Sequence, residues 1–148
     1  MSIFDRFKRA RKKGLPSYLA YVSAPEVKET QDMHQTLNAY VDGYKRKVYR
    51  GTHIDRVFVR AKDEIKEMTD AEIAASVRNG WTYEKQAVFL LKRCLVQEIQ
   101  QPKSNVQMAE VYDFNKRLMT RAIELKISTR GQAKREDKEM RQRCGISE

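Results

Sequence analysis

The side chains that most often carry out catalysis or bind metals are few in this sequence and are not grouped. The two histidines, His34 and His53, have no cysteine or carboxylate at a spacing typical of a metal site. The acidic residues between positions 62 and 67 are interleaved with lysines, a pattern typical of salt bridges between neighbouring turns of one helix. These acids are therefore expected to stabilise a helix rather than to act as an acid–base pair.

The cysteines and glycines also give no catalytic pattern. Cys94 lies on the apolar face of a predicted helix, whereas a nucleophilic thiol needs an exposed, electropositive setting. Two cysteines are too few for a disulfide framework, so Cys94 and Cys144 are expected to be free thiols in a reducing compartment, with a single disulfide between them as the alternative. The glycines are scattered and form no phosphate-binding loop. We expect no catalytic, cofactor-binding or metal-binding residues, and hence no enzymatic activity of the chain itself.

The net charge of +10 is concentrated at the two ends of the chain. Residues 1–14 contain six Lys and Arg against one acid, and residues 116–143 contain ten against four. Residues 15–115 contain fourteen of each sign. A neutral body with basic ends is typical of a protein that attaches to a larger acidic partner, and not of an enzyme that draws its substrate into one charged cleft.

The first basic end also has an apolar side. If residues 2–12 are helical, Ile3, Phe4, Phe7 and Ala10 fall on one narrow stripe and cations occupy the rest. This pattern is typical of a surface-binding helix or of a mitochondrial targeting segment, and a solvated charged arm is the third possibility. The residues expected to dock on a partner are Phe4, Arg6, Phe7, Lys8, Arg9, Arg11, Lys12 and Lys13.

Apolar residues recur at steps of three and four along most of the chain, which predicts helices. Gly51 and Pro102 are expected to stop two of them. The Val-Phe-Val run at 57–59 is compatible with a strand, but residues 62–67 lack strand alternation, so a helix is preferred. Candidate N-cap residues mark the helix starts at Ser23, Thr52, Thr69, Thr82, Ser104 and Thr129.

We therefore predict an all-α fold, a single multi-helix domain of about six helices. It consists of a basic amphipathic arm over 1–14, a helical body over 15–127 and a basic polar helix or tail over 128–148. Between positions 132 and 143 only Ala133 and Met140 are apolar, so this segment is expected to lie against a partner or to stay solvated. No run reaches the roughly 20 apolar residues that a spanning helix needs, and the chain is expected not to cross a membrane.

Two aromatic features allow both a functional and a structural interpretation. Tyr44 and Tyr49 are interleaved with the basic run at 45–50, a pattern in which rings can stack on bases while cations contact phosphates. The alternative is that Tyr44 and Val48 face the core and the cations cover its rim. Trp81, the one tryptophan, precedes the Thr82 cap and is expected to pack over the following helix as a hydrophobic staple, whatever the function.

Three short motifs occur in an order shared with a known family. Lys13-Gly14-Leu15, Tyr21 and Val27-Lys28-Glu29 come first, the sequence Asp-Arg-Val-Phe-Val-Arg-Ala at 55–61 comes next, and Trp-Thr-Tyr-Glu at 81–84 leads into Phe89-Leu90-Leu91. Over residues 13–100 the chain thereby resembles subunit 7, the small matrix-side helical subunit of mitochondrial ubiquinol–cytochrome c reductase (respiratory complex III). It departs from that family by an insertion over 30–52, a longer tail after Pro102 and a missing proline before the tryptophan.

The resemblance implies a non-catalytic accessory or assembly subunit, peripheral on the matrix side of the mitochondrial inner membrane. Its partners would be cytochrome b and the core subunits, with anionic lipid headgroups as further contacts. No cofactor is implied, because the haems belong to other subunits, and Arg56, Arg60 and Trp81 in the matching motifs become candidate docking residues. The alternative is a basic, nucleic-acid-associated structural protein, such as a virion, ribosomal or mobile-element component. A free-standing peripheral membrane protein using only residues 2–12 is a third possibility.

Overall fold

The computed structural model describes residues 32–101 and 103–145, and this part of the chain is all-helical, as predicted. The Ser23 capping box and the predicted N-terminal arm lie outside the described residues. The described helices are α3 (Met33–Lys47), α4 (Arg56–Glu67), α5 (Asp70–Arg78), α6 (Tyr83–Ile99), α7 (Asn105–Glu124) and α8 (Arg130–Cys144).

Four of the predicted N-caps are confirmed. The side-chain oxygens of Thr69, Thr82, Ser104 and Thr129 each accept a hydrogen bond from the backbone N–H three residues further along. At Ser104 and Thr129 the glutamine at the third helical position also accepts from the cap backbone N–H, which completes a capping box. These local hydrogen bonds explain why the starts of α5 to α8 could be predicted from sequence.

The prediction that Thr52 caps a helix is wrong, because α4 begins at Arg56 after Asp55. The backbone N–H groups of Thr52 and His53 instead donate to the carboxylate of Glu110 on α7, at 2.8 Å each. Gly51 is also not a direct helix stop, since α3 ends at Lys47. A Cβ at this position would lie 2.4 Å from the Glu110 carboxyl group, so a larger residue would require that side chain to shift.

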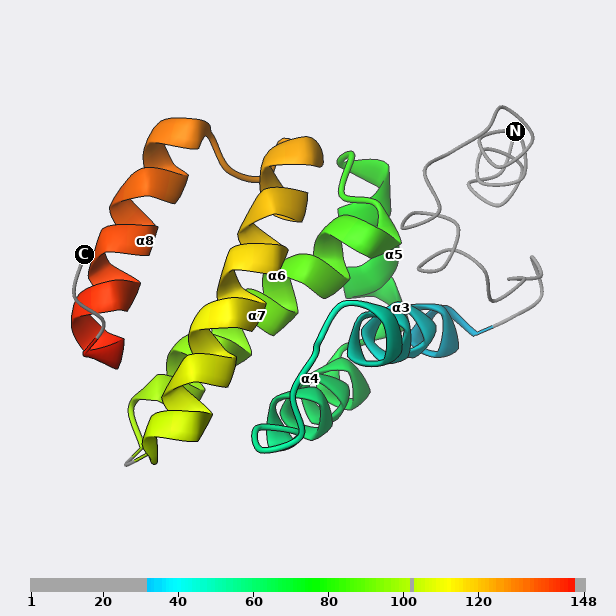
Figure 1. The fold of residues 1–148 in the computed structure, drawn as a ribbon. Coiled ribbons are helices and arrows are strands. Elements are labelled where there is room, and N and C mark those ends of the chain that lie inside the picture. Colours follow the sequence, from blue (N-terminus) through cyan, green and yellow to red (C-terminus); the bar gives the residue numbers. More distant parts are fainter. Residues whose placement is uncertain (1–31, 102, 146–148) are drawn as a thin grey trace.

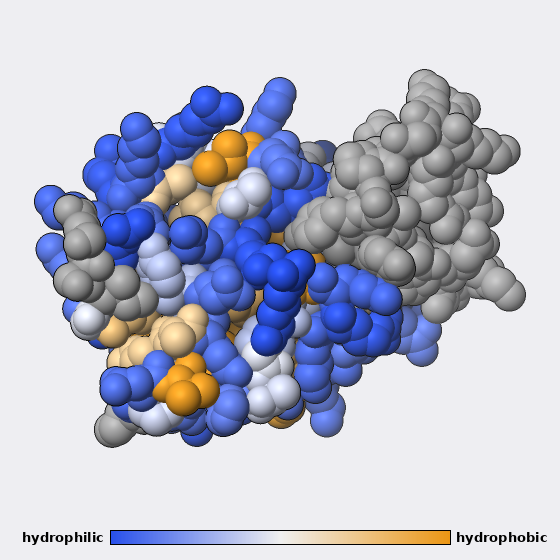
Figure 2. All heavy atoms as spheres, viewed as in Figure 1, coloured by the Kyte–Doolittle hydropathy of each residue, from blue (hydrophilic) through white to orange (hydrophobic). Residues whose placement is uncertain are grey.

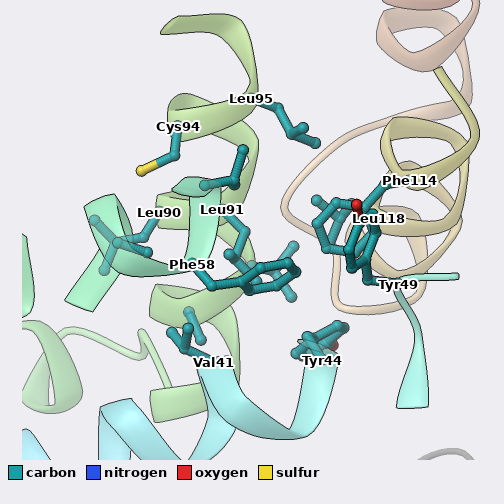
Figure 3. Packing of buried hydrophobic residues seen from close by; sticks show 14 of the residues in the cluster. Val41, Tyr44, Tyr49, Phe58, Leu90, Leu91, Cys94, Leu95, Phe114 and Leu118 are labelled. Atoms are coloured by element: carbon teal, nitrogen blue, oxygen red, sulfur yellow. The ribbon is translucent and has the colours of Figure 1, made fainter. Parts of the chain in front are cut away.

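The central helix is α6, which packs against α3, α4 and α7, while α8 packs against α7 (Figure 1). The core between these helices contains an aromatic cluster of Tyr49, Phe58 and Phe114, with ring centroids 5.3–5.4 Å apart (Figure 3). Tyr44 is fully buried and Tyr49 nearly so. The structural alternative for Tyr44 and Val48 is therefore confirmed, and neither tyrosine ring is available to stack on a base.

The last helix, α8, is less solvated than its composition indicates. Met140 is buried, and Ala133 and Cys144 pack against the core from the same side of α8. The hydroxyl of Tyr112 on α7 donates to Asp137 at 3.0 Å and accepts from Arg141 at 2.8 Å. A few apolar contacts, this polar bridge and an ion pair at 2.8 Å between Glu136 and Lys92 of α6 hold α8 on the domain. Among the described helices, none combines the length and the apolar character that a membrane span requires.

Candidate functional site

The residues proposed for docking fall into three groups. All the candidates between Phe4 and Lys13 lie outside the described residues. Arg56 and Arg60 on α4 both form ion pairs with Glu98, a fully buried carboxylate at the end of α6, which also pairs with Lys103 at 3.2 Å. These two arginines thus compensate a buried charge, while Arg56 itself is exposed and Arg60 is half-buried.

Trp81 is the third candidate, and it lies partly exposed beside α6. Its ring meets Phe89 edge to face, with centroids 5.6 Å apart, and the two side chains are 36% and 46% exposed. Its backbone carbonyl accepts a hydrogen bond from Gln86. Trp81 packs over the following helix as predicted, but its partner lies two turns into α6 and remains accessible to solvent.

Cys94, which is expected to pack on an apolar helix face rather than to act as a nucleophile, is fully buried, and burial raises the pKa of its thiol to about 11. It therefore stays protonated at neutral pH and has no access to a substrate. Cys144 is half-buried, and both cysteines are free thiols, as predicted. The expected packing function of Cys94 is consistent with this environment.

His34 is brought close to two carboxylates, one of which sequence spacing did not reveal. Its Nδ1 lies 2.9 Å from Asp32 and 3.2 Å from Asp70, while Nε2 lies 2.6 Å from the carbonyl oxygen of Met68. Within the described residues these three side chains are the group spaced closely enough to hold a metal ion. A protonated imidazole accounts for the same contacts, because both ring nitrogens then donate, Nδ1 to the carboxylates and Nε2 to the Met68 carbonyl. Asp32 also caps α3 by accepting from the His34 backbone N–H.

Among the residues that the structure describes, a charged feature runs across α7 and reaches the end of α3 on one side and α8 on the other. Two hollows lie along it and share Thr120 of α7. Five of its six cations are exposed, and Arg117 is half-buried. We call it the basic tract, and its cations are Lys47, Arg50, Lys116, Arg117, Arg130 and Lys134.

The hollow between α3 and α7 has a volume of about 290 Å³. Val48, Thr120 and Arg121 contribute to its lining, and Lys47, Arg50 and Arg117 stand around it with Glu124 as the one lining acid. Arg121 donates two hydrogen bonds to the buried Glu84, at 2.9 and 3.2 Å, and one to Glu124 at 2.7 Å. Burial works against its charged form, but these bonds outweigh it and raise the pKa of Arg121.

The second hollow, of about 360 Å³, lies between α7 and α8 and is mainly apolar. Met119, Ile123 and Ala133 contribute to its lining, and Lys116, Arg130 and Lys134 stand at its edge with one acid, Asp137. Figure 2, viewed from the side on which α7 and α8 are both in sight, shows hydrophilic residues over most of this face.

Counted over both hollows, seven Lys and Arg residues face two acids. The sequence predicts Lys47 and Arg50 as candidate nucleic-acid contacts within the basic run at 45–50, and it indicates the cations after position 115 only as part of a basic end. The fold places these two sequence regions side by side. Comparison with protein-family models, with curated proteins and with solved structures found no match to this chain.

Proposed function

We propose that this protein is a non-catalytic, nucleic-acid-associated structural protein that binds the phosphate backbone through the basic tract. The observation that carries the proposal is the joining of cations from α3, α7 and α8 into one surface. Phosphate neutralisation requires clustered Lys and Arg, and it needs no base-reading motif. The contacts are therefore expected to be independent of sequence.

The distribution of aromatic residues supports backbone binding over base stacking. Tyr44 and Tyr49, which are interleaved with the basic run at 45–50, are buried in the core. The half-buried ring of Tyr112, next to Lys116 of the tract, is already packed by the cationic groups of Lys116 and Arg141, which lie 5.5 and 5.8 Å from its centroid. What the tract offers is charge and guanidinium groups, which suit phosphate oxygens. Duplex and single strands should both bind, with affinity set mainly by charge density.

A salt titration of the full-length protein tests this proposal. Binding to arbitrary DNA and RNA is measured by fluorescence anisotropy over a range of salt concentrations. Six tract cations predict that a log–log plot of the binding constant against salt concentration has a slope steeper than about −3 and up to about −5.

Exchanging Lys116 and Lys134 for glutamine should make the slope shallower by about 1 per lost phosphate contact. Matched exchanges of Lys66 and Arg78, exposed residues on α4 and α5, should leave the slope unchanged. Binding weaker than millimolar at physiological salt would rule the proposal out.

The second candidate function is that of an accessory subunit of respiratory complex III, which the resemblance implies. The specific observation in its favour is the partly exposed Trp81–Phe89 pair, because it lies within the matching motif and exposed aromatic pairs are typical anchors of protein interfaces. In this case the partners are cytochrome b and the core subunits on the matrix side of the inner membrane, and the basic surface contacts acidic protein or anionic headgroups.

Native purification through this chain after mild detergent extraction tests the second candidate. The respiratory proposal expects a large assembly with haem absorption bands, and expects that exchange of Trp81 for alanine releases the chain from it. Recovery of the wild-type chain only as a free species, or with nucleic acid and no haem, would contradict it.

A further inference from the structure

The hollow between α7 and α8 has three exposed cations at its edge, and they form no ion pair with any acid of the described residues. They are Lys116, Arg130 and Lys134. The ammonium group of Lys116 lies over the Tyr112 ring, 5.5 Å from its centroid, and this contact leaves its charge unneutralised. The one acid in the lining, Asp137, is already paired with Arg141 at 3.0 Å. The hollow therefore presents positive charge to a ligand.

These cations stand at both ends of the hollow. The helix α8 runs back along α7 in the opposite direction, so Arg130 at its start lies beside the end of α7 (Figure 1). Lys116 lies about 10 Å further back along α7 than Ile123, at a rise of about 1.5 Å per residue. It therefore faces the other end, where the Tyr112 hydroxyl bonds to Asp137. A ligand in the hollow meets positive charge on both sides of its apolar part.

The lining itself offers apolar surface and one amide. The side chains of Met119, Ile123 and Ala133 supply the apolar part. Asn115 is only 4% exposed, and it lines this hollow and a neighbouring one between α6 and α8. Within the described residues its side-chain amide forms no hydrogen bond, so it is available to a group that enters the hollow. An amide suits a ligand with both donor and acceptor atoms.

An unpaired base within a single strand matches this arrangement. A base has flat apolar faces and hydrogen-bonding groups at its edge, and the strand continues from it with a phosphate on each side. An anionic lipid carries its charge at one end only, which would leave the cations at the other end without a partner. In a duplex the bases are paired and stacked and cannot reach the hollow. The volume of about 360 Å³ is at the low end of ligand pockets and suits one base.

We propose that the hollow between α7 and α8 binds one unpaired base of a single-stranded nucleic acid. The phosphates on either side of this base contact Lys116 at one end and Arg130 and Lys134 at the other. The apolar lining packs against the base, and the Asn115 amide bonds to its edge. This inference rests on the proposed nucleic-acid association and adds one contact that does not depend on charge. Apolar packing accepts any base, so the binding stays largely independent of sequence.

The test compares a single strand of about 12 nucleotides with an abasic strand of the same length, which keeps every phosphate and lacks every base. Affinities for the full-length protein are measured by fluorescence anisotropy over a range of salt concentrations. The strand with bases should bind about tenfold more tightly. The two log–log plots against salt should be parallel, because both ligands offer the same phosphates.

Two variants locate the base without changing the charge. Ala133→Leu fills part of the hollow, and Ile123→Asn removes apolar surface from it. Each should bind the strand with bases only about as tightly as the abasic strand. Ala109→Leu adds the same side chain as the first variant at an exposed position of α7 outside the hollow, and Trp81→Ala removes an exposed ring outside the tract. Both controls should keep the preference, and melting curves verify that all variants fold.

The outcomes separate the inference from the function on which it rests. Equal, salt-sensitive binding of both strands overturns the base site and leaves backbone binding in place. A preference for bases that survives the exchanges at Ala133 and Ile123 places the base elsewhere and also overturns the site. If Ala133→Leu weakens binding to phosphatidylglycerol vesicles but not to the strand, the hollow binds lipid and the inference fails. A preference for bases with a shallow salt slope supports the site and counts against the extended tract. The absence of binding to either strand overturns both.

Discussion

Cations are used in opposite ways at the junction of α4 with α6 and along the basic tract. At the junction, Arg56, Arg60 and Lys103 surround the fully buried Glu98. In the tract, Lys116, Arg130 and Lys134 stand exposed at the edge of a hollow that has a single acid in its lining. The residue types are the same, and the difference is whether a buried carboxylate lies within reach.

This comparison shows that a candidate docking residue must be distinguished from a cation that compensates an interior charge. The Asp-Arg-Val-Phe-Val-Arg segment that carries the family resemblance is explained by the fold, because Phe58 enters the aromatic core while Arg56 and Arg60 meet Glu98.

Among the tract cations, Arg117 pairs with the half-exposed Asp113 at 2.9 Å and Lys116 lies over the Tyr112 ring, and neither contact compensates a buried charge. We therefore expect changes at the junction to alter stability, and changes in the tract to alter binding.

The largest effect on stability is predicted for the exchange Glu98→Gln. The amide keeps the shape of the side chain but leaves three cations next to a neutral buried group, which should lower the free energy of unfolding by about 3 kcal/mol. The value is at the low end for a broken buried pair because Arg56 and Arg60 are partly exposed. Urea denaturation followed by circular dichroism measures it.

The control for this variant is Glu139→Gln, since Glu139 is an exposed acid on α8. Its free energy of unfolding should stay within about 0.5 kcal/mol of the wild type. If the two exchanges cost the same, Glu98 does not organise the junction, and Arg56 and Arg60 become available as docking residues again.

The next largest effect is predicted for Gly51→Ala. The added methyl group would meet the Glu110 carboxyl group at 2.4 Å and the Tyr49 hydroxyl at 2.7 Å, and these groups hold the loop between α3 and α4. Displacing them should lower stability by about 1–3 kcal/mol. Gly131→Ala in α8, where the nearest atom is 3.9 Å away, should be neutral or stabilise by up to about 1 kcal/mol. A similar cost at both glycines would contradict the close approach at Gly51.

Local signals predicted the helices well because N-caps and apolar periodicity act within a few residues. The loop over 48–55 was mispredicted because the acceptor that shapes it, Glu110, comes from α7, 57 and 58 positions along the chain. The basic tract needed the fold for the same reason, since α3 and α7 had to be brought together. One tertiary signal was present in the sequence: Glu84 and Glu98 are in phase with the apolar face of α6, a position at which an acid needs a buried partner.

A smaller effect is predicted at His34. Its hydrogen bond to the Met68 carbonyl, followed by that to Asp32, raises the pKa of the imidazole. Because the folded pKa is raised, protonation favours the folded state. This stability is fully present below the unfolded value of about 6.5, and is lost as the pH rises through the higher folded pKa. The contribution should be well under 1 kcal/mol, because the site is partly open to solvent.

Melting temperatures at about pH 5.5 and about pH 8.5 measure this contribution when the wild type is compared with His34→Gln. The wild type should lose more stability between the two values, and Asp70→Asn should lower the imidazole pKa in an NMR titration. Identical pH profiles of wild type and His34→Gln would show that the contacts of His34 do not persist in solution.

The smallest effect on stability is predicted for the tract itself, and it sharpens the comparison most. The double exchange Lys116→Glu and Lys134→Glu changes the charge by −4, yet both side chains are exposed, so stability should change by less than about 0.5 kcal/mol per site. Binding to nucleic acid should nevertheless weaken at least tenfold, because two phosphate contacts are lost and two repulsions are added.

The exchanges Lys66→Glu and Arg78→Glu have the same net charge change on α4 and α5 and separate local from global charge. If this control weakens binding equally, the affinity follows net charge and no defined surface carries it. If the tract variant unfolds, its cations stabilise the fold like those around Glu98, and the distinction between the two regions fails.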